Sequence, residues 1–570
     1  MTMEHLIAVA RGDQAADLLL RNGHIVNVYS GEILALDVAV AAGHIAGFGP
    51  RPAHAEVDLG GRYLAPGFID AHVHIESTMA SPADFARAVL PHGTTTVVAD
   101  PHEIANVLGL PGIDYMLQAT AALPLQFFFT LPSCVPATAM ETTGADLSAK
   151  AMAPLMAHPR VVALAEMMNF PGVIQADPDV LAKIQLAQDA HKPADGHAPG
   201  VRDFSLDAYI GAGIGSDHEC IHLEEALAKL QRGMHIMIRE GTGAKNMAAL
   251  LPLVRPETAH RLMWCTDDRH LHDILAEGHL DAIVRQAIRA GVPPQLAIRL
   301  ATLNPAVYFG LRRTGALAPG QRADMVVLSN LEDPAVEAVY AGGQLVAEEG
   351  KLLESTPIPD HAPPAAAMNI DPGGLDFTLK ATGTQVRVIE IVPGQIVTRQ
   401  SVHQAPIVDG RAVSDPHRDL LKIAVLERHR GTGDTGIGYL KGMGLRCGAM
   451  ASSVAHDAHN IIVVGASDAD MLAAVRQVIA MGGGLAVAMD QKILAQLALP
   501  IAGLMSPAPV WSIQRRLSEL TQTVRDLGSP LPDPFMTLSF LALPVIPELK
   551  ITDQGLVDVN RFQPVNLFRQ

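Results

Sequence analysis

The fold prediction starts from residues 68–76, which read Phe68-Ile69-Asp70-Ala71-His72-Val73-His74-Ile75-Glu76. This run begins apolar and ends in acidic and imidazole side chains. Alternate side chains of a strand point to the same side, so His72 and His74 face one side together. Two imidazoles placed in this way can hold a divalent transition metal. Two buried histidines that only hydrogen-bond to their neighbours would have the same spacing, so the stretch alone leaves both interpretations open.

Further strand-like runs follow this one, and amphipathic stretches such as Ser81–Leu90 and Leu223–Leu230 separate them. Eight strand–helix units in about 250 residues are typical of a closed parallel (β/α)8 barrel. The active site of such a barrel lies at the carboxyl ends of its strands, which is where the polar residues of these runs gather. The eight runs are Phe68–Glu76, Thr94–Asp100, Gln126–Leu131, Val161–Met168, Lys192–His197, Gly213–Glu219, His235–Gly241 and Leu262–Asp268.

The barrel is expected to interrupt a smaller β-rich domain. Strand-like Ala35–Val40 precedes it, and Ala323–Leu328 and Val336–Gly343 follow it with the same character. Four prolines between residues 357 and 364 indicate a linker, and strand-like Ile461–Val464 and helical Ala469–Ile479 then belong to another globular region. The expected fold class is α/β, with a small β-sandwich in residues 1–66 plus 314–356, the barrel in 67–313 and a C-terminal α/β domain in 365–570.

The composition excludes several classes of protein. A chain of 570 residues is too long for one domain. Its net charge of −17, without any run of Lys and Arg, argues against a nucleic-acid partner. No stretch of about 18 apolar residues is free of charge, so we expect no membrane span. The four widely spaced cysteines suit a reducing compartment, and the first residues lack a signal-peptide pattern, so we expect a cytoplasmic protein.

Residue types that bind metals recur at the ends of other runs. Glu166 lies near the end of the fourth run, His197 ends the fifth, His218 lies near the end of the sixth, and Asp267 near that of the eighth. One catalytic tetrahedral metal with an open position needs fewer ligands than this. A carboxylate shared by two metals accounts for the excess, and we assign that bridge to Glu166. The predicted ligands of two divalent metal ions are His72, His74, Glu166, His197, His218 and Asp267.

Three other patterns are less informative. His218–His222 matches the HExxH pattern of zinc proteases, but that pattern needs a helix, and the glycines before it predict a strand and a loop. Gly431–Gly436 matches GxGxxG without a strand–turn–helix frame, which favours a glycine-rich turn. The sequence has no PCxxC motif of the kind found in cysteine-containing zinc deaminases of nucleobases.

The histidine pair of the first run, with ligand-type groups on strands four, five, six and eight, resembles the amidohydrolase superfamily. Within that superfamily the sequence resembles the adenine deaminase family over nearly its whole length. Pro101-His102-Glu103 and Glu166-Met167-Met168-Asn169 narrow the resemblance to this family. Further matching stretches are Pro66–Ser77, Ala99–Asn106, Asp195–Pro199, Arg239–Thr242, Cys265–His270, Gly315–Asp324 and Ser453–Asn460.

The resemblance implies hydrolytic deamination of adenine to hypoxanthine and ammonia by a hydroxide shared between two divalent metals. It implies manganese or iron, although the ligand types would also accept zinc. Asp267 would serve as general base and then acid. His102 and Glu103 could instead only cap the next helix, and His456, Asp457 and His459 either close over the pocket or serve their own region. The candidate residues are Asp267, Glu103 and His102 for catalysis, and Asp268, Glu76, Glu219 and Arg239 for substrate binding.

Two alternatives stay open. The protein could be another amidohydrolase that acts on a different amino-heterocycle or a cyclic amide, which a panel of substrates would reveal. It could also be a non-catalytic barrel used as an assembly platform, and analysis of bound metal would test that. The expected partners are a small purine substrate and further copies of the chain, as a dimer or tetramer.

Overall fold

The computed structural model describes residues 3–364 and 368–569. Within that part of the chain, eight parallel strands pair in chain order, β8 to β12 in one sheet and β13 to β15 in another. Parallel backbone bridges from Ala194 to Ile214 and from Val73 to Asp267 join the two sheets at both edges, so the ring is closed. The strands are β8 (Phe68–Val73), β9 (Thr94–Ala99), β10 (Gln126–Leu131), β11 (Val161–Met167), β12 (Ala194–Gly196), β13 (Ser216–Asp217), β14 (His235–Arg239) and β15 (Leu262–Cys265).

This ring confirms the predicted barrel, and every strand lies inside its predicted run. Most strands end before the run does, because the polar residues at the ends of the runs leave the strand conformation. Asp267, two residues beyond β15, has a φ of 57°, a left-handed conformation that cannot continue a strand. Four of the predicted metal ligands, His74, His197, His218 and Asp267, are therefore carried by the loops that follow the strands.

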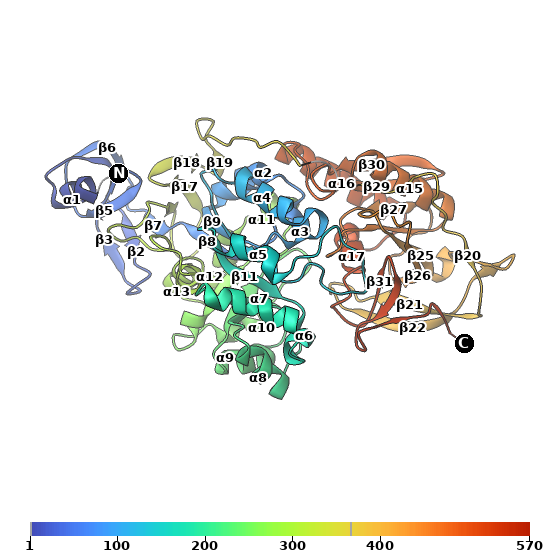
Figure 1. Cartoon of the computed structure of the whole chain (residues 1–570). Helices are drawn as coiled ribbons and strands as arrows, with labels where there is room; N and C mark the ends of the chain where they lie inside the picture. The colour runs from blue at the N-terminus through green and yellow to red at the C-terminus, as the bar shows by residue number, and fades with distance from the viewer. Residues whose placement is uncertain (1–2, 365–367, 570) are drawn as a thin grey trace.

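Helices surround the barrel and connect its strands (Figure 1). Local signals start them: the Ser81 hydroxyl accepts a hydrogen bond from the Asp84 amide at the start of α2, where Pro82 occupies the first turn. The predicted amphipathic stretches coincide with α2 and α9, which confirms them. The helices are α2 (Pro82–Val89), α3 (His102–Leu108), α4 (Leu110–Ala119), α5 (Ala149–Met156), α6 (Phe170–Ile174), α7 (Pro178–Asp189), α8 (Asp203–Gly211), α9 (Leu223–Gln231), α10 (Met247–Leu250), α11 (Leu271–Glu277), α12 (Leu280–Arg289), α13 (Pro294–Leu300) and α14 (Leu303–Tyr308).

The two flanks of the barrel meet in one β-rich region near the N-terminus (Figure 1). The strand that leads into the barrel, β7, pairs antiparallel with β16, which follows the barrel. The extended run at 35–40 is divided between two strands, because β3 ends at Ala35 and β4 begins at Val38. The domain limits stay a prediction. This region contains α1 (Met3–Arg11), β1 (Ala16–Arg21), β2 (His24–Val26), β3 (Ile33–Ala35), β4 (Val38–Ala41), β5 (His44–Phe48), β6 (Ala53–Asp58), β7 (Tyr63–Pro66), β16 (Met325–Leu328), β17 (Val336–Ala341), β18 (Gln344–Glu348) and β19 (Lys351–Leu352).

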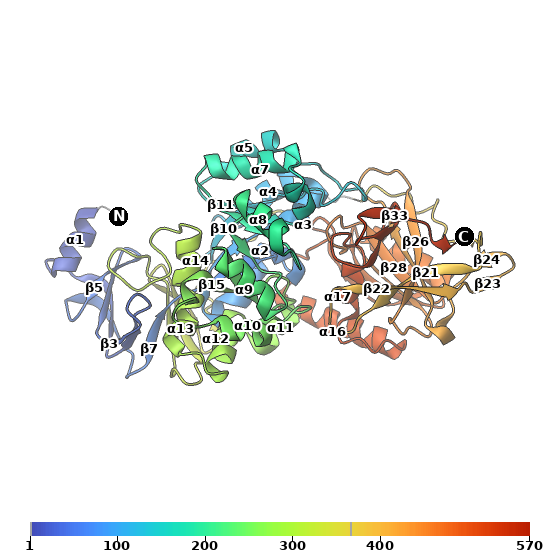
Figure 2. The same ribbon diagram turned by 90° about the horizontal axis from the view of Figure 1, so that it is seen from below.

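The C-terminal region is built around a mostly antiparallel sheet in the order β22-β21-β26-β25-β28-β27-β29-β30, and Figure 2 shows it beside the barrel. Its β28 and α15 confirm the predicted strand and helix at 461–464 and 469–479. The prolines of the predicted linker lie in a stretch without helix or strand among its described residues. The main elements are β21 (Gln385–Ile391), β22 (Thr398–Gln404), β25 (Leu421–Leu426), β26 (Thr435–Lys441), β27 (Ala449–Ser452), β28 (Ile461–Gly465), α15 (Asp468–Ala480), β29 (Gly484–Met489), β30 (Lys492–Ala498), α16 (Val510–Asp526), α17 (Pro534–Phe540), β31 (Leu549–Thr552), β32 (Gly555–Asp558) and β33 (Gln563–Val565).

The C-terminal region packs directly on the barrel. The Ser506 amide donates a hydrogen bond to the Met79 carbonyl at 2.8 Å, and the Ser81 amide donates one to the Ser506 carbonyl at 3.1 Å. Met79 and Phe540 belong to one buried apolar cluster that spans both regions. Across residues 3–364 and 368–569, no helix is both long and apolar enough to cross a bilayer.

Candidate metal centre and substrate pocket

The carboxyl ends of the barrel strands border one pocket that the barrel shares with the C-terminal region. The barrel contributes most of the acidic and imidazole side chains, and the C-terminal region adds mainly apolar ones. The barrel residues that line it are His74, His102, Glu103, Glu166, Met168, His197, His218, Glu219, Arg239, Gly241, Gly243, Ala244, Asp267 and Asp268. The lining residues of the C-terminal region are Ile396, His456, Asp457, Phe540, Leu543 and Ile546.

Four predicted ligands converge beside the end of β8. The Nε2 atoms of His72 and His74 lie 3.1 Å apart. Glu166 Oε1 is 3.5 Å from His72 Nε2 and 3.2 Å from His74 Nε2. Asp267 Oδ1 is 3.5 Å and 3.1 Å from the same two nitrogens. Ligand atoms held about 2.1 Å from a tetrahedral metal stand about 3.4 Å from one another, so this donor set fits a divalent metal ion.

The other oxygen of Glu166 faces a different pair of histidines. Glu166 Oε2 lies 2.5 Å from His197 Nδ1 and 3.3 Å from His218 Nε2. All of these side chains are buried. One carboxylate thus directs its two oxygens to two different pairs of imidazoles, an arrangement that would suit a bridge between two metals.

The charge balance of this site also suits cations. Burial would raise the pKa of Glu166, but His218 and His197 hold it well below its ordinary value. Burial likewise opposes the charged form of His72, yet its hydrogen bonds to Asp267 and Glu166 raise its pKa to about 10. The buried carboxylates therefore favour positive charge at the imidazoles, and divalent metals would supply that charge.

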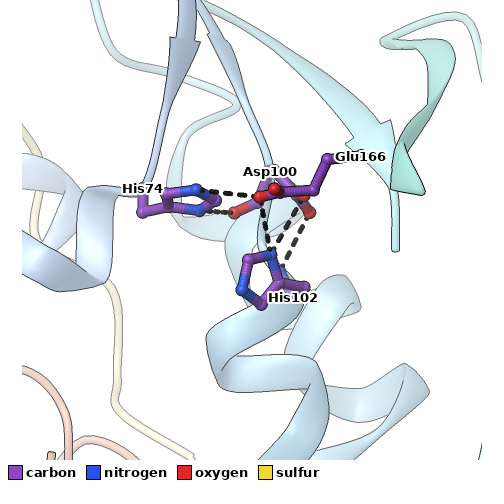
Figure 3. Close-up of side chains that lie close together, drawn as sticks. All are labelled: His74, Asp100, His102 and Glu166. Carbon is purple, nitrogen blue, oxygen red and sulfur yellow. Dashed lines mark hydrogen bonds and ion pairs between the residues drawn. The ribbon is translucent and has the colours of Figure 1, made fainter. Parts of the chain in front are cut away.

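Asp100 was absent from the predicted site, although it directly precedes the Pro101-His102-Glu103 stretch. Figure 3 shows it between His74 and His102, next to Glu166. Its carbonyl lies 3.1 Å from His74 Nδ1, and its Oδ2 lies 3.0 Å from His102 Nδ1. Asp100 therefore orients both rings, and it leaves Nε2 of His74 directed at the metal ligands.

Asp267 is fixed by its backbone and by Arg239. Its amide donates to the His72 carbonyl at 2.9 Å, and its carbonyl accepts from the His74 amide at 3.2 Å. Arg239 Nη1 donates to Asp267 Oδ2 at 2.6 Å and also binds Glu219. Burial raises the pKa of Asp267, but the charge of Arg239 and the hydrogen bonds to His72 and His74 together hold it well below its ordinary value. Asp267 is thus an anion whose Oδ1 faces the histidine pair.

The other substrate-binding candidates occupy different places. Asp268 lines the pocket and accepts a hydrogen bond from the Ser77 hydroxyl. Glu219 lines it too, and it forms a two-pronged ion pair with Arg239. Glu76 does not line the pocket: its Oε1 accepts from the Ile104 amide at 3.2 Å, and it is buried behind the wall. Burial, followed by the charge of Glu103, raises the pKa of Glu76 to about 7.

His102 and Glu103 begin α3, but neither side chain caps that helix. His102 Nε2 lies 3.6 Å from Glu103 Oε1 and 3.7 Å from Asp457 Oδ1. Glu103 also contacts His456 and His459. The polar loop of the C-terminal region therefore closes over the barrel site, which was one of the two possibilities for these three residues.

Sequence reasoning missed the apolar wall of the pocket, formed by Met168 and by Ile396, Phe540, Leu543 and Ile546. No sequence signal marks such residues, since isolated apolar side chains far along the chain look like core.

The HExxH and GxGxxG patterns do not form the motifs that they resemble, as expected. His218 follows β13 in a loop and His222 directly precedes α9, so HExxH does not form one helix. Of the Gly431–Gly436 pattern, residues 431–434 lie in a loop, and Thr435 and Gly436 begin β26.

Two family models match this chain. A model of the amidohydrolase family matches residues 63–346, and one of the adenine deaminase C-terminal domain matches residues 395–563. Among solved structures, an enamidase described as a member of the amidohydrolase superfamily aligns with a TM-score of 0.45 and 16% identity, covering 60% of this chain and 98% of that chain.

Relatives that align over nearly their full length are more similar in sequence. A protein named adenine deaminase from Desulfatibacillum aliphaticivorans is 55% identical over 568 residues, which is 100% of both chains. Another of that name from Dehalococcoides mccartyi is 49% identical over 566 residues, 98% of each chain. A third from Kosmotoga olearia is 47% identical over 575 residues, 100% of this chain and 99% of the relative. On this full-length similarity, the chain belongs to the adenine deaminase family of the amidohydrolase superfamily.

Proposed function

We propose that the protein hydrolyses adenine to hypoxanthine and ammonia, in purine salvage or catabolism. The observation that carries the choice of substrate is the 55% identity over the full chain to a relative named adenine deaminase. The pocket supports the chemistry, because it combines a donor set for two divalent metals with acidic side chains that can move protons or accept hydrogen bonds. In the overall reaction, water oxygen bonds to C6 of the purine and the C6 amino group leaves as ammonia.

We assign the metal ligands as predicted. His72, His74 and Asp267 would hold one ion with Glu166 Oε1, and His197 and His218 would hold the other with Glu166 Oε2. When bound, the two metals supply Lewis acidity that makes a water molecule nucleophilic near neutral pH. We propose manganese or iron as the metals, and the imidazole and carboxylate ligands would also suit zinc.

Asp267 is assigned the transfer of the proton from water to the departing amine. Its low pKa makes it an anion at neutral pH, so its carboxylate can accept the proton. His102 and Glu103 line the same pocket and are proposed to hold or donate protons at the purine ring. Both side chains are held in place by neighbours: Asp100 contacts the His102 ring, and His456 of the C-terminal region contacts the Glu103 carboxylate.

Asp268 and Glu219 are proposed to bind polar edges of the purine. Ser77 engages one oxygen of Asp268, so the other oxygen is free to accept an N–H of the base. Arg239 keeps Glu219 ionised and directed at the pocket. Glu76 does not line the pocket, and we propose that it acts indirectly. Its Oε1 accepts a hydrogen bond from the backbone of α3, the helix that carries Glu103.

Further proposals concern the organisation of the whole protein. We propose a cytoplasmic homo-oligomer, a dimer or tetramer, and the division into β-sandwich, barrel and C-terminal domain given above. The cysteines of the described residues, which are all unpaired, support a reducing compartment.

The test is to load the purified protein with manganese or iron, add adenine, and measure ammonia and hypoxanthine. Stoichiometric formation of both products is expected. Adenosine and a set of cyclic amides and other amino-heterocycles serve as comparison substrates. Turnover of one of these in place of adenine would favour the alternative amidohydrolase, and absence of both metal and turnover would favour the assembly platform.

A further inference from the structure

The C-terminal region holds Glu103, although this residue belongs to the barrel helix α3. His456 Nδ1 lies 2.5 Å from Glu103 Oε1, and His459 Nε2 hydrogen-bonds to Glu103 Oε2. The nearest barrel imidazole, His102 Nε2, is 3.6 Å from Oε1, beyond hydrogen-bond distance. We propose that His456 and His459 are positioning residues that fix the Glu103 carboxylate in the pocket, so that the C-terminal region completes the active site. This rests on the proposed deamination.

The hydrogen-bond pattern around His459 defines its role. The Ala455 amide donates to His459 Nδ1 at 3.1 Å, so that nitrogen carries no proton. A neutral ring must then carry its proton on Nε2, which donates to Glu103. The same proton prevents Nε2 from binding a metal, even though Glu103, His456 and His459 lie close enough together to surround one. The cluster is therefore a hydrogen-bonded support and not a third metal site.

His456 is fixed in a different way. Its ring stacks on Phe540 with centroids 4.6 Å apart and planes at 19°, and its amide donates to the Ser539 carbonyl at 3.2 Å. Both contacts lie within the C-terminal region, where Phe540 is also part of the pocket wall. Contacts within the C-terminal region thus fix the plane of the His456 ring independently of Glu103, and its Nδ1 points at the Glu103 carboxylate.

The loop that carries both histidines is tied to the barrel as well. Asn460 Nδ2 donates to the carbonyl of Thr142 at 2.9 Å, in the loop that follows β10. His429 Nε2 lies 2.6 Å from the Ala458 carbonyl and so supports the loop from its own side. A shift between barrel and C-terminal region would therefore move both donors away from Glu103 at once.

The experiment compares variants that remove the donor with variants that keep it. His459→Leu and His456→Leu remove the N–H. His459→Gln places an amide N–H near the position of Nε2, and His456→Asn places one near Nδ1. His403→Leu is the matched control, since this half-buried histidine of β22 pairs with Glu390 away from the pocket. Each full-length, metal-loaded protein is assayed for kcat and KM with adenine, for metal content and for thermal unfolding.

We expect the leucine variants to lose about 10- to 100-fold in kcat, the effect of losing a hydrogen bond to a charged group, with unchanged metal content. The glutamine and asparagine variants should recover most of this loss, and the control should match wild type. Combining His459→Leu with Glu103→Gln should cost no more than Glu103→Gln alone, because His459 acts through Glu103. Equal losses in the leucine and amide variants, or additive losses in the double variant, would overturn the proposal.

A readout that does not depend on turnover separates this inference from the proposed function. In protein labelled with ¹⁵N-histidine, the His459 ring should give the Nε2–H tautomer, assigned by loss of its signals in His459→Gln. The Nδ1–H tautomer would overturn the inference even in an active enzyme. If wild type leaves adenine unchanged, the proposed function fails, and the tautomer still decides whether His459 donates to Glu103.

Discussion

Asp267 and Asp268 are adjacent in sequence but differ in what they contact, so we expect their asparagine variants to fail in different ways. Asp267 directs Oδ1 to His72 and His74 and Oδ2 to Arg239, 2.6 Å away. Asp268 instead accepts from the Ser77 hydroxyl and lines the pocket. Asp267→Asn keeps the shape and removes the proton acceptor, whereas Asp268→Asn leaves the metal ligands and the proton acceptor in place.

The size of each effect follows from these contacts. Removing a general base typically lowers kcat by about 10²- to 10⁴-fold, or about 3–5 kcal/mol in activation free energy. Asp267→Asn should fall in this range with KM largely retained. Arg239 keeps its two bonds to Glu219 in this variant, so the loss of stability should stay near that of one charged hydrogen bond, about 1.5–3 kcal/mol. Asp268→Asn should raise KM about 10- to 100-fold, since a charged acceptor becomes neutral.

Steady-state kinetics with adenine and elemental analysis of the same preparations measure both variants side by side. Thermal unfolding serves as the control for a general loss of structure. If Asp268→Asn strips the metal while Asp267→Asn keeps its rate, the two assignments are reversed. That result would show that the left-handed backbone of Asp267 does not place its side chain at the metal centre.

Wild-type protein should contain two metals per chain, and Glu166→Gln should lose both metal and rate, because a neutral amide bridges two cations poorly; at most one metal in fully active protein would contradict the bridge. Adenine should react and adenosine should not, and comparable turnover of both would show that the pocket admits a ribose. Lys550 donates to the carbonyls of Ile396 and Phe540 beside the pocket, and burial lowers its pKa to about 7. The unfolded chain, with a lysine pKa of about 10.4, then binds more protons between these two values, so wild type should gain stability relative to Lys550→Met as the pH rises from about 7 to 10. Melting temperatures of the two proteins that run parallel over this range would contradict this shift.

The sequence by itself identified the barrel and most of its site because both depend on local patterns. Strand-like runs at regular intervals predict eight strand–helix units, and a parallel barrel brings the ends of those strands to one rim. His72, His74, Glu166, His197, His218 and Asp267 could therefore be grouped without any coordinates, and the structure places them together. Asp100 was within reach of the same reasoning, since it ends the second run.

Only the tertiary structure decided which side chains face each other across long separations in the chain. The pairing of Glu103 with His456 and His459 joins residues more than 350 positions apart, and no periodicity encodes it. The sequence also gives no signal for the apolar wall of the pocket, which includes Ile396 and Ile546, because an isolated Ile or Leu has the same local pattern in a core and in a pocket. The sequence also could not show that Arg239 would bind both Glu219 and Asp267, since that contact depends on how far β14 and its loop carry the side chain. Spacing along the chain determines which residues share a strand end, whereas packing of separate regions determines what closes over them.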